Sequence, residues 1–188
     1  IHNCSFGNNV SGYEGDALSC AGTKIYNCTI VYNGTQDGEC VIKANWNTKI
    51  ESSIIWHNEN PQIFNNNTPI SVDYSIIYGG QSSFSDQGNL NWGTGNITSD
   101  PLFTGSGGFE SQSPAINAGN PNGFYNDSDG TRENIGYSGD GAHRILVTPT
   151  NFDFGNSGVG DALSKDWMIY NFGENELIID SYSSSDNQ

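Results

Sequence analysis

The sequence predicts an all-β protein whose N-terminal part is a right-handed single-stranded parallel β-helix. The first observation is a six-residue phrase that occurs four times, at residues 1–6, 25–30, 50–55 and 72–77. Each copy opens with an aliphatic residue, carries a small residue three positions later and closes with a large apolar residue. Successive copies begin 24, 25 and 22 residues apart. A period in the low twenties, rich in β-branched residues, is typical of a β-solenoid with one coil per repeat.

A column of asparagines supports the same register. Asn9, Asn33 and Asn58 each follow the closing apolar residue of a copy by three positions. Stacked coils place equivalent residues about 4.8 Å apart, so we expect these side-chain amides to form a hydrogen-bonded ladder. Asparagine also tolerates the left-handed backbone of a tight turn. Leu18 and Ile42, which lie 24 residues apart, indicate a second strand in each coil.

The composition restricts the function classes. The chain has 25 Asn and 24 Gly among 188 residues, which is typical of a turn-rich β protein. Six basic residues against 21 acidic ones give a net charge of −15, which repels phosphates. We therefore expect no nucleic-acid partner, and because no apolar run approaches the length of a membrane span we expect no membrane insertion. The acidic surface fits a secreted protein that meets cations or neutral glycans, and the alternative is that the charge only maintains solubility. Because the chain opens within a repeat, we expect the natural protein to extend upstream.

The cysteines leave two interpretations open. Cys4 and Cys28 occupy equivalent inward positions of adjacent coils, where they form either a disulfide or a stack of buried free thiols. The chain has no CxxC motif and only three histidines, so a zinc site is not expected.

Two aromatic residues are the candidate binding residues. Trp56 and Tyr78 each follow a closing isoleucine, so they are expected side by side on the outer face of the coils, where aromatic rings pack against sugars. The alternative is that the long loops 57–69 and 79–99 cover them. The Gly/Ser/Asn-rich stretch from residue 81 to residue 99 lacks periodicity and is interpreted as an excursion from the coil.

Catalytic residues are not expected in this chain. A polysaccharide lyase needs a Lys or Arg base near the sugar, and a hydrolase needs two carboxylates at a defined separation. The candidates are Lys24 and Lys49, which are expected to stack near Glu51, and His57. The lysines are more simply interpreted as outward charges on a solvated face.

The acidic turn at residues 126–130 is the candidate metal site. Asp127 and Asp129 can direct hard oxygen ligands to one point, with Asn126 and Glu133 completing a Ca²⁺ shell. The alternative is an Asx-turn in which Arg132 pairs with an aspartate.

Four phrases in order, VDYSIIYGG, GNITSDPLF, SPAINAGNP and DSDGTRENIGYSG, resemble the C-terminal end of the bacterial choice-of-anchor Q proteins. That group belongs to the pectin-lyase-like right-handed β-helices, and the resemblance covers about residues 50–139. The sequence departs from the usual family motifs at Asn117, where the family has Asp, and at Asn134 and Tyr137, where D-I-G-A becomes N-I-G-Y. The resemblance implies a secreted, multidomain surface protein and no single activity.

A second domain is expected at residues 141–188, after a β-helix domain at residues 1–140. Alternating apolar residues predict antiparallel strands there. Residues 147–179 resemble the opening of an ASH/hydin-type immunoglobulin-like domain. About three strands are present where a sandwich has about seven, so we expect an incomplete domain whose apolar face is covered from outside. The covers considered are the β-helix, another surface or secretion protein, and further sequence. The alternating residues are Phe152, Phe154, Trp167, Ile169, Leu177 and Ile179.

These observations favour a non-catalytic structural or adhesive region of a large secreted or cell-surface bacterial β-helix protein, with polysaccharide as the candidate ligand. The alternative is part of a pectin-lyase-like polysaccharide lyase or glycoside hydrolase whose active site lies mostly on coils upstream.

Overall fold

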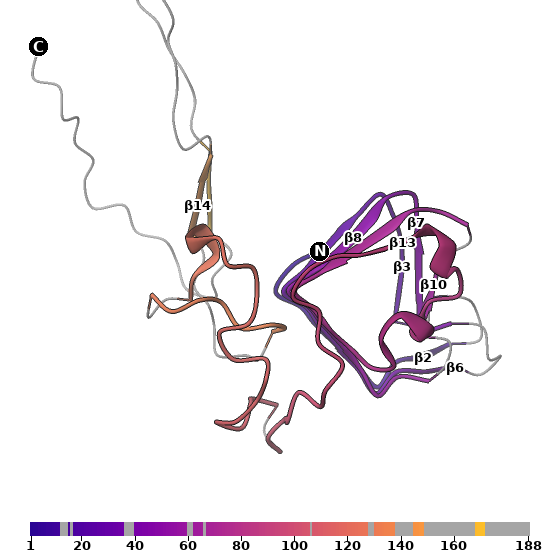
Figure 1. Ribbon diagram of the computed structural model, residues 1–188, viewed down its shortest axis with the longest axis horizontal. Helices are drawn as coiled ribbons and strands as arrows, with labels where there is room; N and C mark the ends of the chain where they lie inside the picture. The colour runs from indigo at the N-terminus through magenta and orange to yellow at the C-terminus, as the bar shows by residue number, and fades with distance from the viewer. Residues whose placement is uncertain are drawn as a thin grey trace, which may run out of the picture. The chain divides into compact units, whose positions relative to one another are not determined.

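The computed structural model describes residues 1–137 except 12–14, 16, 36–39, 60–61, 66, 106 and 128–129, and the backbone of residues 145–148 and 168–171. The chain divides into two compact units, Ile1–Asp140 and Gly141–Gln188. The first unit is a parallel β-solenoid with three-sided coils, so the predicted all-β, parallel β-helical class is confirmed (Figure 1). No helix within the described part of the chain is long and apolar enough to cross a membrane.

The first side of the coil is a four-stranded parallel sheet in the order β13-β11-β8-β4. Its register pairs Ile25 with Ile50 and Ile50 with Val72, which are the opening residues of three repeated phrases. Trp92 continues this level beside Val72. The strands are β4 (Lys24–Tyr26), β8 (Thr48–Glu51), β11 (Ile70–Asp73) and β13 (Leu90–Trp92).

The second side is a four-stranded parallel sheet in the order β1-β5-β9-β12. The closing residues Phe6, Ile30, Ile55 and Ile77 pair in succession, as the repeated phrase predicts. The strands are β1 (Ser5–Gly7), β5 (Thr29–Val31), β9 (Ile54–Trp56) and β12 (Ile76–Ile77).

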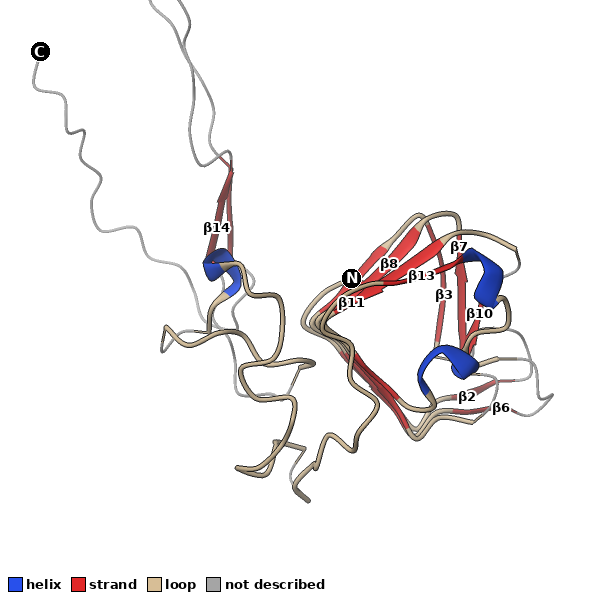
Figure 2. Cartoon of the chain, in the orientation of Figure 1, coloured by secondary structure: helices blue, strands red, loops and turns tan. Residues whose placement is uncertain are grey.

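The third side has the order β10-β7-β3, with Leu18 paired to Ile42 and Ile42 paired to Ile63 (Figure 2). A short parallel pair, β2 with β6, lies between the second and third sides along the chain. These strands are β2 (Val10–Ser11), β3 (Leu18–Ala21), β6 (Gly34–Thr35), β7 (Ile42–Asn45) and β10 (Ile63–Phe64).

The stretch expected to leave the coil after residue 80 instead forms another turn of it. Phe84 bridges Ile63 on the third side, β13 pairs with β11 on the first, and Ile97 bridges Ile76 on the second. The inward apolar residues keep the coil spacing, and the Gly and Ser residues between them hide it in the sequence. Two short 3₁₀ helices, η1 (Gly80–Ser83) and η2 (Gln87–Asn89), provide the connections.

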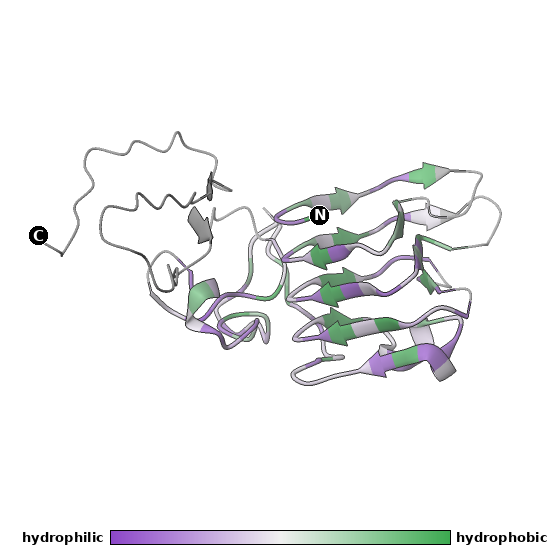
Figure 3. Ribbon diagram, turned by 90° about the horizontal axis from the view of Figure 1, so that it is seen from above, coloured by the Kyte–Doolittle hydropathy of each residue, from purple (hydrophilic) through white to green (hydrophobic). Residues whose placement is uncertain are grey.

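The interior of the coils is a stack of aliphatic side chains. The members at each level are β-branched and fully buried, and Figure 3 shows the apolar strands repeated from coil to coil. Each large side chain buried in this way contributes about 1.5–3 kcal/mol relative to exposure. The core consists mainly of Ile25, Ile30, Val41, Ile42, Ile50, Ile55, Ile63, Ile70, Val72 and Ile77.

Residues with left-handed backbone form two columns at the two ends of the second side. Asn27, Ser52 and Tyr74 adopt φ of 47°, 49° and 47° where the first side turns into the second. At the other end, Tyr32 and His57 adopt φ of 56° and 48°. Non-glycine residues seldom adopt this conformation, so its repetition shows that both turns keep one geometry in successive coils.

The side chains of Asn9, Asn33 and Asn58 form a hydrogen-bonded ladder directly after the second of these turns. Asn33 Nδ2 donates to Asn58 Oδ1 at 2.9 Å, and Asn9 Nδ2 donates to Asn33 Oδ1 at 2.9 Å. Each acceptor oxygen also receives the backbone N–H of the preceding coil at 3.0 Å. In the next coil Gly80 occupies the ladder position and has no side-chain amide. Asn58 Nδ2 instead donates to Gln62 Oε1 at 3.4 Å.

A flanking segment, defined here as residues 98–137, lies along the outer face of the second side. Gly136 N donates to Ser52 O at 2.7 Å, and Thr29 Oγ1 donates to Tyr137 O at 2.8 Å. The segment includes a short 3₁₀ helix, η3 (Gly123–Tyr125), and buries Ala115 and Ile135. A second apolar core therefore lies outside the coil, and its buried members are Ile54, Trp56, Ile76, Ala115 and Ile135.

The second unit is described only as an antiparallel pair, β14 (Ile145–Thr148) with β15 (Met168–Asn171). The predicted strands that carry Phe152, Phe154, Leu177 and Ile179 lie outside the described residues. The incomplete immunoglobulin-like domain therefore stays a prediction.

Candidate functional site

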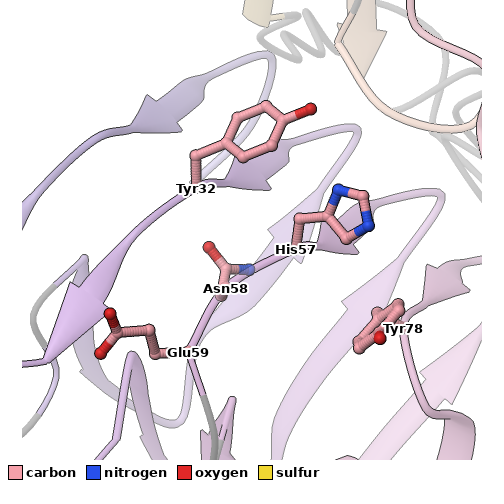
Figure 4. A pocket seen from close by; sticks show the side chains of 5 residues that line it. All are labelled: Tyr32, His57, Asn58, Glu59 and Tyr78. Carbon is pink, nitrogen blue, oxygen red and sulfur yellow. The ribbon is translucent and has the colours of Figure 1, made fainter.

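Three aromatic rings form a strip at the turn where the second side of the coil ends. We call Tyr32, His57 and Tyr78 the aromatic corner; Figure 4 shows the rings following one another across successive coils. The ring centroids of Tyr32 and His57 are 5.8 Å apart, and those of His57 and Tyr78 are 5.4 Å apart. Tyr32 is 53% exposed and Tyr78 is 40% exposed. Such a row presents apolar ring faces to solvent.

The left-handed backbone of Tyr32 and His57 directs these rings outward. Bulky residues rarely adopt positive φ, and the conformation costs about 1–2 kcal/mol for an L-residue. The following residues, Asn33 and Asn58, hold the turn through the ladder. Large rings are therefore kept at positions where glycine or asparagine would fit with less strain, as Gly79 does in the next coil.

Two neighbouring depressions share the rings of Tyr32 and His57. The larger is an open hollow of about 630 Å³. The smaller, of about 240 Å³, lies where the flanking segment meets the corner. The larger is lined by Tyr32, His57, Asn58, Glu59 and Tyr78. The smaller is lined by Tyr32, Trp56, His57, Asp100, Leu102, Phe103 and Glu110.

Of the two interpretations of Trp56, exposed or covered, the structure agrees with the covered one. Its ring contacts Tyr78 edge-on, with centroids 5.0 Å apart, but only 5% of the residue is exposed. Ile97, from the predicted covering stretch 79–99, packs against the core that contains Trp56, and so do Phe103 and Phe109 of the flanking segment. The expected pair of exposed rings is thus replaced by Tyr78 together with Tyr32 and His57.

The indole nitrogen of Trp56 is unpartnered. Trp56 Nε1 is buried and has no hydrogen-bond partner among the described residues. A buried tryptophan N–H usually finds an acceptor, so such an orphan requires an explanation. Trp56 is one of the residues that line the smaller depression.

The charged residues at both depressions are acidic. Asp100 and Glu110 line the smaller one and Glu59 lines the larger, whereas the described lining includes no lysine or arginine. Asp100 Oδ1 accepts from Leu102 N at 2.8 Å, which fixes the turn that carries it.

The lysines considered as bases lie elsewhere, on the first side of the coil. Lys24 Nζ pairs with Glu51 Oε2 at 2.9 Å and lies 4.4 Å from the ring centroid of Tyr26, and Lys49 stands beside Lys24 in the sheet register. The Lys24 ammonium is therefore engaged by a carboxylate.

Glu133 joins the flanking segment to the solenoid. Its fully buried carboxylate accepts from Tyr26 Oη at 2.5 Å, from Ser52 Oγ at 2.5 Å and from Asn120 N at 2.8 Å. The sequence placed Glu133 in a candidate calcium shell and did not connect it with Tyr26. The local signal for the buried role of Glu133 is weak: an acidic residue stands two positions before the apolar Ile135, after the SPAINAG phrase.

The residues of the calcium prediction are described in part. Asp127 Oδ2 accepts from Asn134 N at 3.2 Å, and Asn126 Nδ2 donates to Gly130 O at 3.0 Å. Asp129 lies outside the described residues. Arg132 donates through Nε to Gly119 O at 2.7 Å. Within the described ranges no group of three acidic, histidine or cysteine side chains could hold a metal ion, and calcium binding stays a prediction.

All four cysteines are free thiols, which agrees with the second of the two interpretations for Cys4 and Cys28. Burial disfavours the thiolate and raises the pKa of Cys28 to about 11. Its thiol donates to Tyr26 O at 3.2 Å. Cys28 is therefore a structural side chain rather than a nucleophile.

Comparison of the chain with protein-family models, curated proteins and solved structures finds no match. The function therefore has to be argued from the site.

Proposed function

We propose that this chain is a non-catalytic, glycan-binding region of a secreted or cell-surface bacterial protein, and that the aromatic corner is its binding surface. The observation that carries the proposal is the strip of exposed rings, Tyr32, His57 and Tyr78, of which the first two stand on a strained left-handed backbone. Sugar rings stack on such faces, and the open hollow beside them accommodates an extended chain.

Rigidity of the scaffold favours this function. The ladder and the flanking segment fix the corner on two sides, so little conformational entropy is lost when a ligand binds. The absence of lysine and arginine from the described lining makes a neutral or cationic glycan more suitable than a uronate chain.

We also propose that the chain is related to the choice-of-anchor Q proteins that its sequence resembles. The phrases SPAINAG and ENIGYSG, which carry that resemblance, lie together: Ile135 N donates to Ala115 O at 2.8 Å, and Gly119 N donates to Glu133 O at 2.9 Å. These bonds join the two phrases within the flanking segment, and Gly136 N, which donates to Ser52 O, attaches the second phrase to the coils. We propose that the second unit is the start of an immunoglobulin-like spacer and that the whole belongs to a pectin-lyase-like surface protein.

Isothermal titration calorimetry of the full chain against a panel of neutral and charged oligosaccharides tests the binding function. Tyr32→Ala and Tyr78→Ala are each expected to weaken the affinity for the best ligand by about tenfold, because each removes a ring face. Trp46→Ala is the matched control, since Trp46 is 72% exposed and lines neither depression. Unchanged affinity in both tyrosine variants would rule out the corner, and release of shortened or unsaturated sugars would favour the enzyme alternative.

A further inference from the structure

We propose that the glycan bound at the aromatic corner carries a protonated amine, as in a de-N-acetylated hexosamine, and that the smaller depression is the subsite for that sugar. The inference rests on the glycan-binding function proposed above and narrows its ligand class.

Charge gives the first reason. Asp100 and Glu110 face the smaller depression from the flanking segment, and Glu59 lies at the larger one. The carboxylate of Glu110 accepts no hydrogen bond from the described residues, and Asp100 uses one oxygen for Leu102 N. Oxygens with spare acceptor capacity attract an ammonium group, which offers three donors and a positive charge. A uronate at the same place would be repelled.

The aromatic wall gives the second reason. Tyr32 and Trp56 line the same depression as the two carboxylates. Ring faces attract cations through their quadrupole, and the combination of rings and acids is how proteins recognise organic ammonium groups. A neutral hexose would use the rings but would leave the charge of the carboxylates uncompensated.

The indole nitrogen of Trp56 gives the third reason. Only 5% of Trp56 is exposed, and its Nε1 has no hydrogen-bond partner among the described residues. A donor of this kind needs an acceptor oxygen, which a sugar hydroxyl next to the amine supplies. An amino sugar thus brings donors for Asp100 and Glu110 and an acceptor for Trp56 in one residue.

The test compares four tetrasaccharides on the full chain by calorimetry at low salt and mildly acidic pH. The ligands are a β-1,4 glucosamine tetramer, its fully N-acetylated form, cellotetraose and tetragalacturonate. The glucosamine tetramer is expected to bind at least about tenfold more tightly than the two neutral ligands, with an affinity that falls as salt rises. Tetragalacturonate is expected to bind most weakly. Equal affinity for the glucosamine tetramer and cellotetraose would overturn the inference.

Carboxylate variants separate this inference from the binding function itself. Asp100→Asn and Glu110→Gln are expected to reduce the affinity for the glucosamine tetramer to about that for cellotetraose, and to change the affinity for cellotetraose much less. Asp86→Asn is the control, because Asp86 lies outside both depressions. If the tyrosine variants lower neutral-glycan binding but the carboxylate variants change nothing, the glycan function stands and the amine subsite is wrong.

The tryptophan contact has its own readout. In ¹⁵N-labelled protein the indole N–H signal of Trp56, assigned from its loss in Trp56→Phe, is expected to shift on addition of the glucosamine tetramer. The signal of Trp46 is the internal control and should stay in place. A bound state in which the Trp56 signal does not move would contradict the placement of the sugar in the smaller depression.

Discussion

Asn33 makes more side-chain hydrogen bonds than its neighbours in the ladder, because it has a partner coil on each side. Its Oδ1 accepts from Asn9, and its Nδ2 donates to Asn58 and to the carbonyl oxygens of Phe6 and Val31 at 3.0 and 3.1 Å. Only 1% of the residue is exposed, so none of these bonds is replaced by water when the amide is removed.

The first prediction follows from that position. Asn33→Ala is expected to lower the free energy of unfolding by about 1–3 kcal/mol, since buried polar groups lose their partners. Urea denaturation followed by circular dichroism measures the change. Asn91→Ala is the control: Asn91 is exposed on β13, and its replacement should change the stability by less than about 0.5 kcal/mol. Equal midpoints for the two variants would show that the ladder contributes nothing.

The second prediction concerns Cys28. Its pKa is raised from 9.0 to about 11, so the folded protein holds the thiol proton more tightly than the unfolded chain does. The corresponding stability is fully present below about pH 9 and is lost as the pH rises towards 11. Site-resolved alkylation measured by mass spectrometry should show no modification of native Cys28 at neutral pH, and labelling that grows across this window. Rapid labelling at neutral pH would contradict the buried thiol.

Residue-scale prediction from sequence succeeds where the partners repeat. Asn33 and Asn58 are recognisable because equivalent positions in successive coils carry the same residue type, and stacking alone brings them together. The sequence left the burial of Trp56 open and did not identify part of its cover, for the opposite reason. That part of the cover comes from Phe103 and Phe109, which belong to no repeat, so no periodic signal connects them with the coil.

The flanking segment is the element whose attachment depends most on a single glycine. Gly136 has φ of +80°, and a Cβ added there would lie 2.6 Å from Ile54 Cδ1 and 2.8 Å from Thr29 Oγ1. Backbone and packing therefore both exclude a side chain where the segment contacts β9.

The third prediction separates these two contributions with a matched pair of substitutions. Gly130 also has a positive φ, of +84°, but a Cβ there would meet nothing within 4 Å. Gly130→Ala is expected to cost about 1–2 kcal/mol of stability from backbone strain alone. Gly136→Ala should cost clearly more, and should increase proteolytic cleavage between residues 98 and 137. A thermal melt in which the two variants behave alike would argue against close packing on Ile54.

Elements are predictable from the sequence to the extent that their contacts are periodic. The strands of the coils follow from the repeated phrase, whereas the hydrogen bond between Tyr26 and Glu133 joins residues 107 positions apart. Even the last turn of the coil was mistaken for a loop, because Gly and Ser between Phe84 and Ile97 obscure the inward positions. The resemblance located the SPAINAG and ENIGYSG phrases but not the surface against which they pack.

The net charge of the whole molecule, −15, makes its stability sensitive to ions. Repulsion among 21 acidic residues opposes compaction and is weakened by salt. The fourth prediction is that sodium chloride raises the melting temperature of the full chain, as measured by differential scanning calorimetry. A melting temperature that falls with salt would show that attractive pairs such as Lys24 with Glu51 dominate instead.

Calcium at the same ionic strength distinguishes general screening from a specific site. If Asp127 and Asp129 bind Ca²⁺, calcium chloride should raise the melting temperature more than sodium chloride does, and Asp127→Asn should abolish the difference. Equal effects of the two salts in the parent chain would exclude the predicted metal site.

The ladder also determines where this molecule can change its length. Between the ladder and the third side of the coil, Asn33 and Ile42 are nine positions apart, whereas Asn58 and Ile63 are five apart. Between the opening and closing residues of each phrase the distance is always five positions, as from Ile25 to Ile30. Insertions and deletions of several residues are therefore absorbed on the arc between the ladder and the third side, and the two left-handed turns stay aligned. A foreign peptide inserted between Asn33 and Ile42 should be displayed without disturbing the stack, which makes the solenoid a scaffold with one adjustable loop per coil.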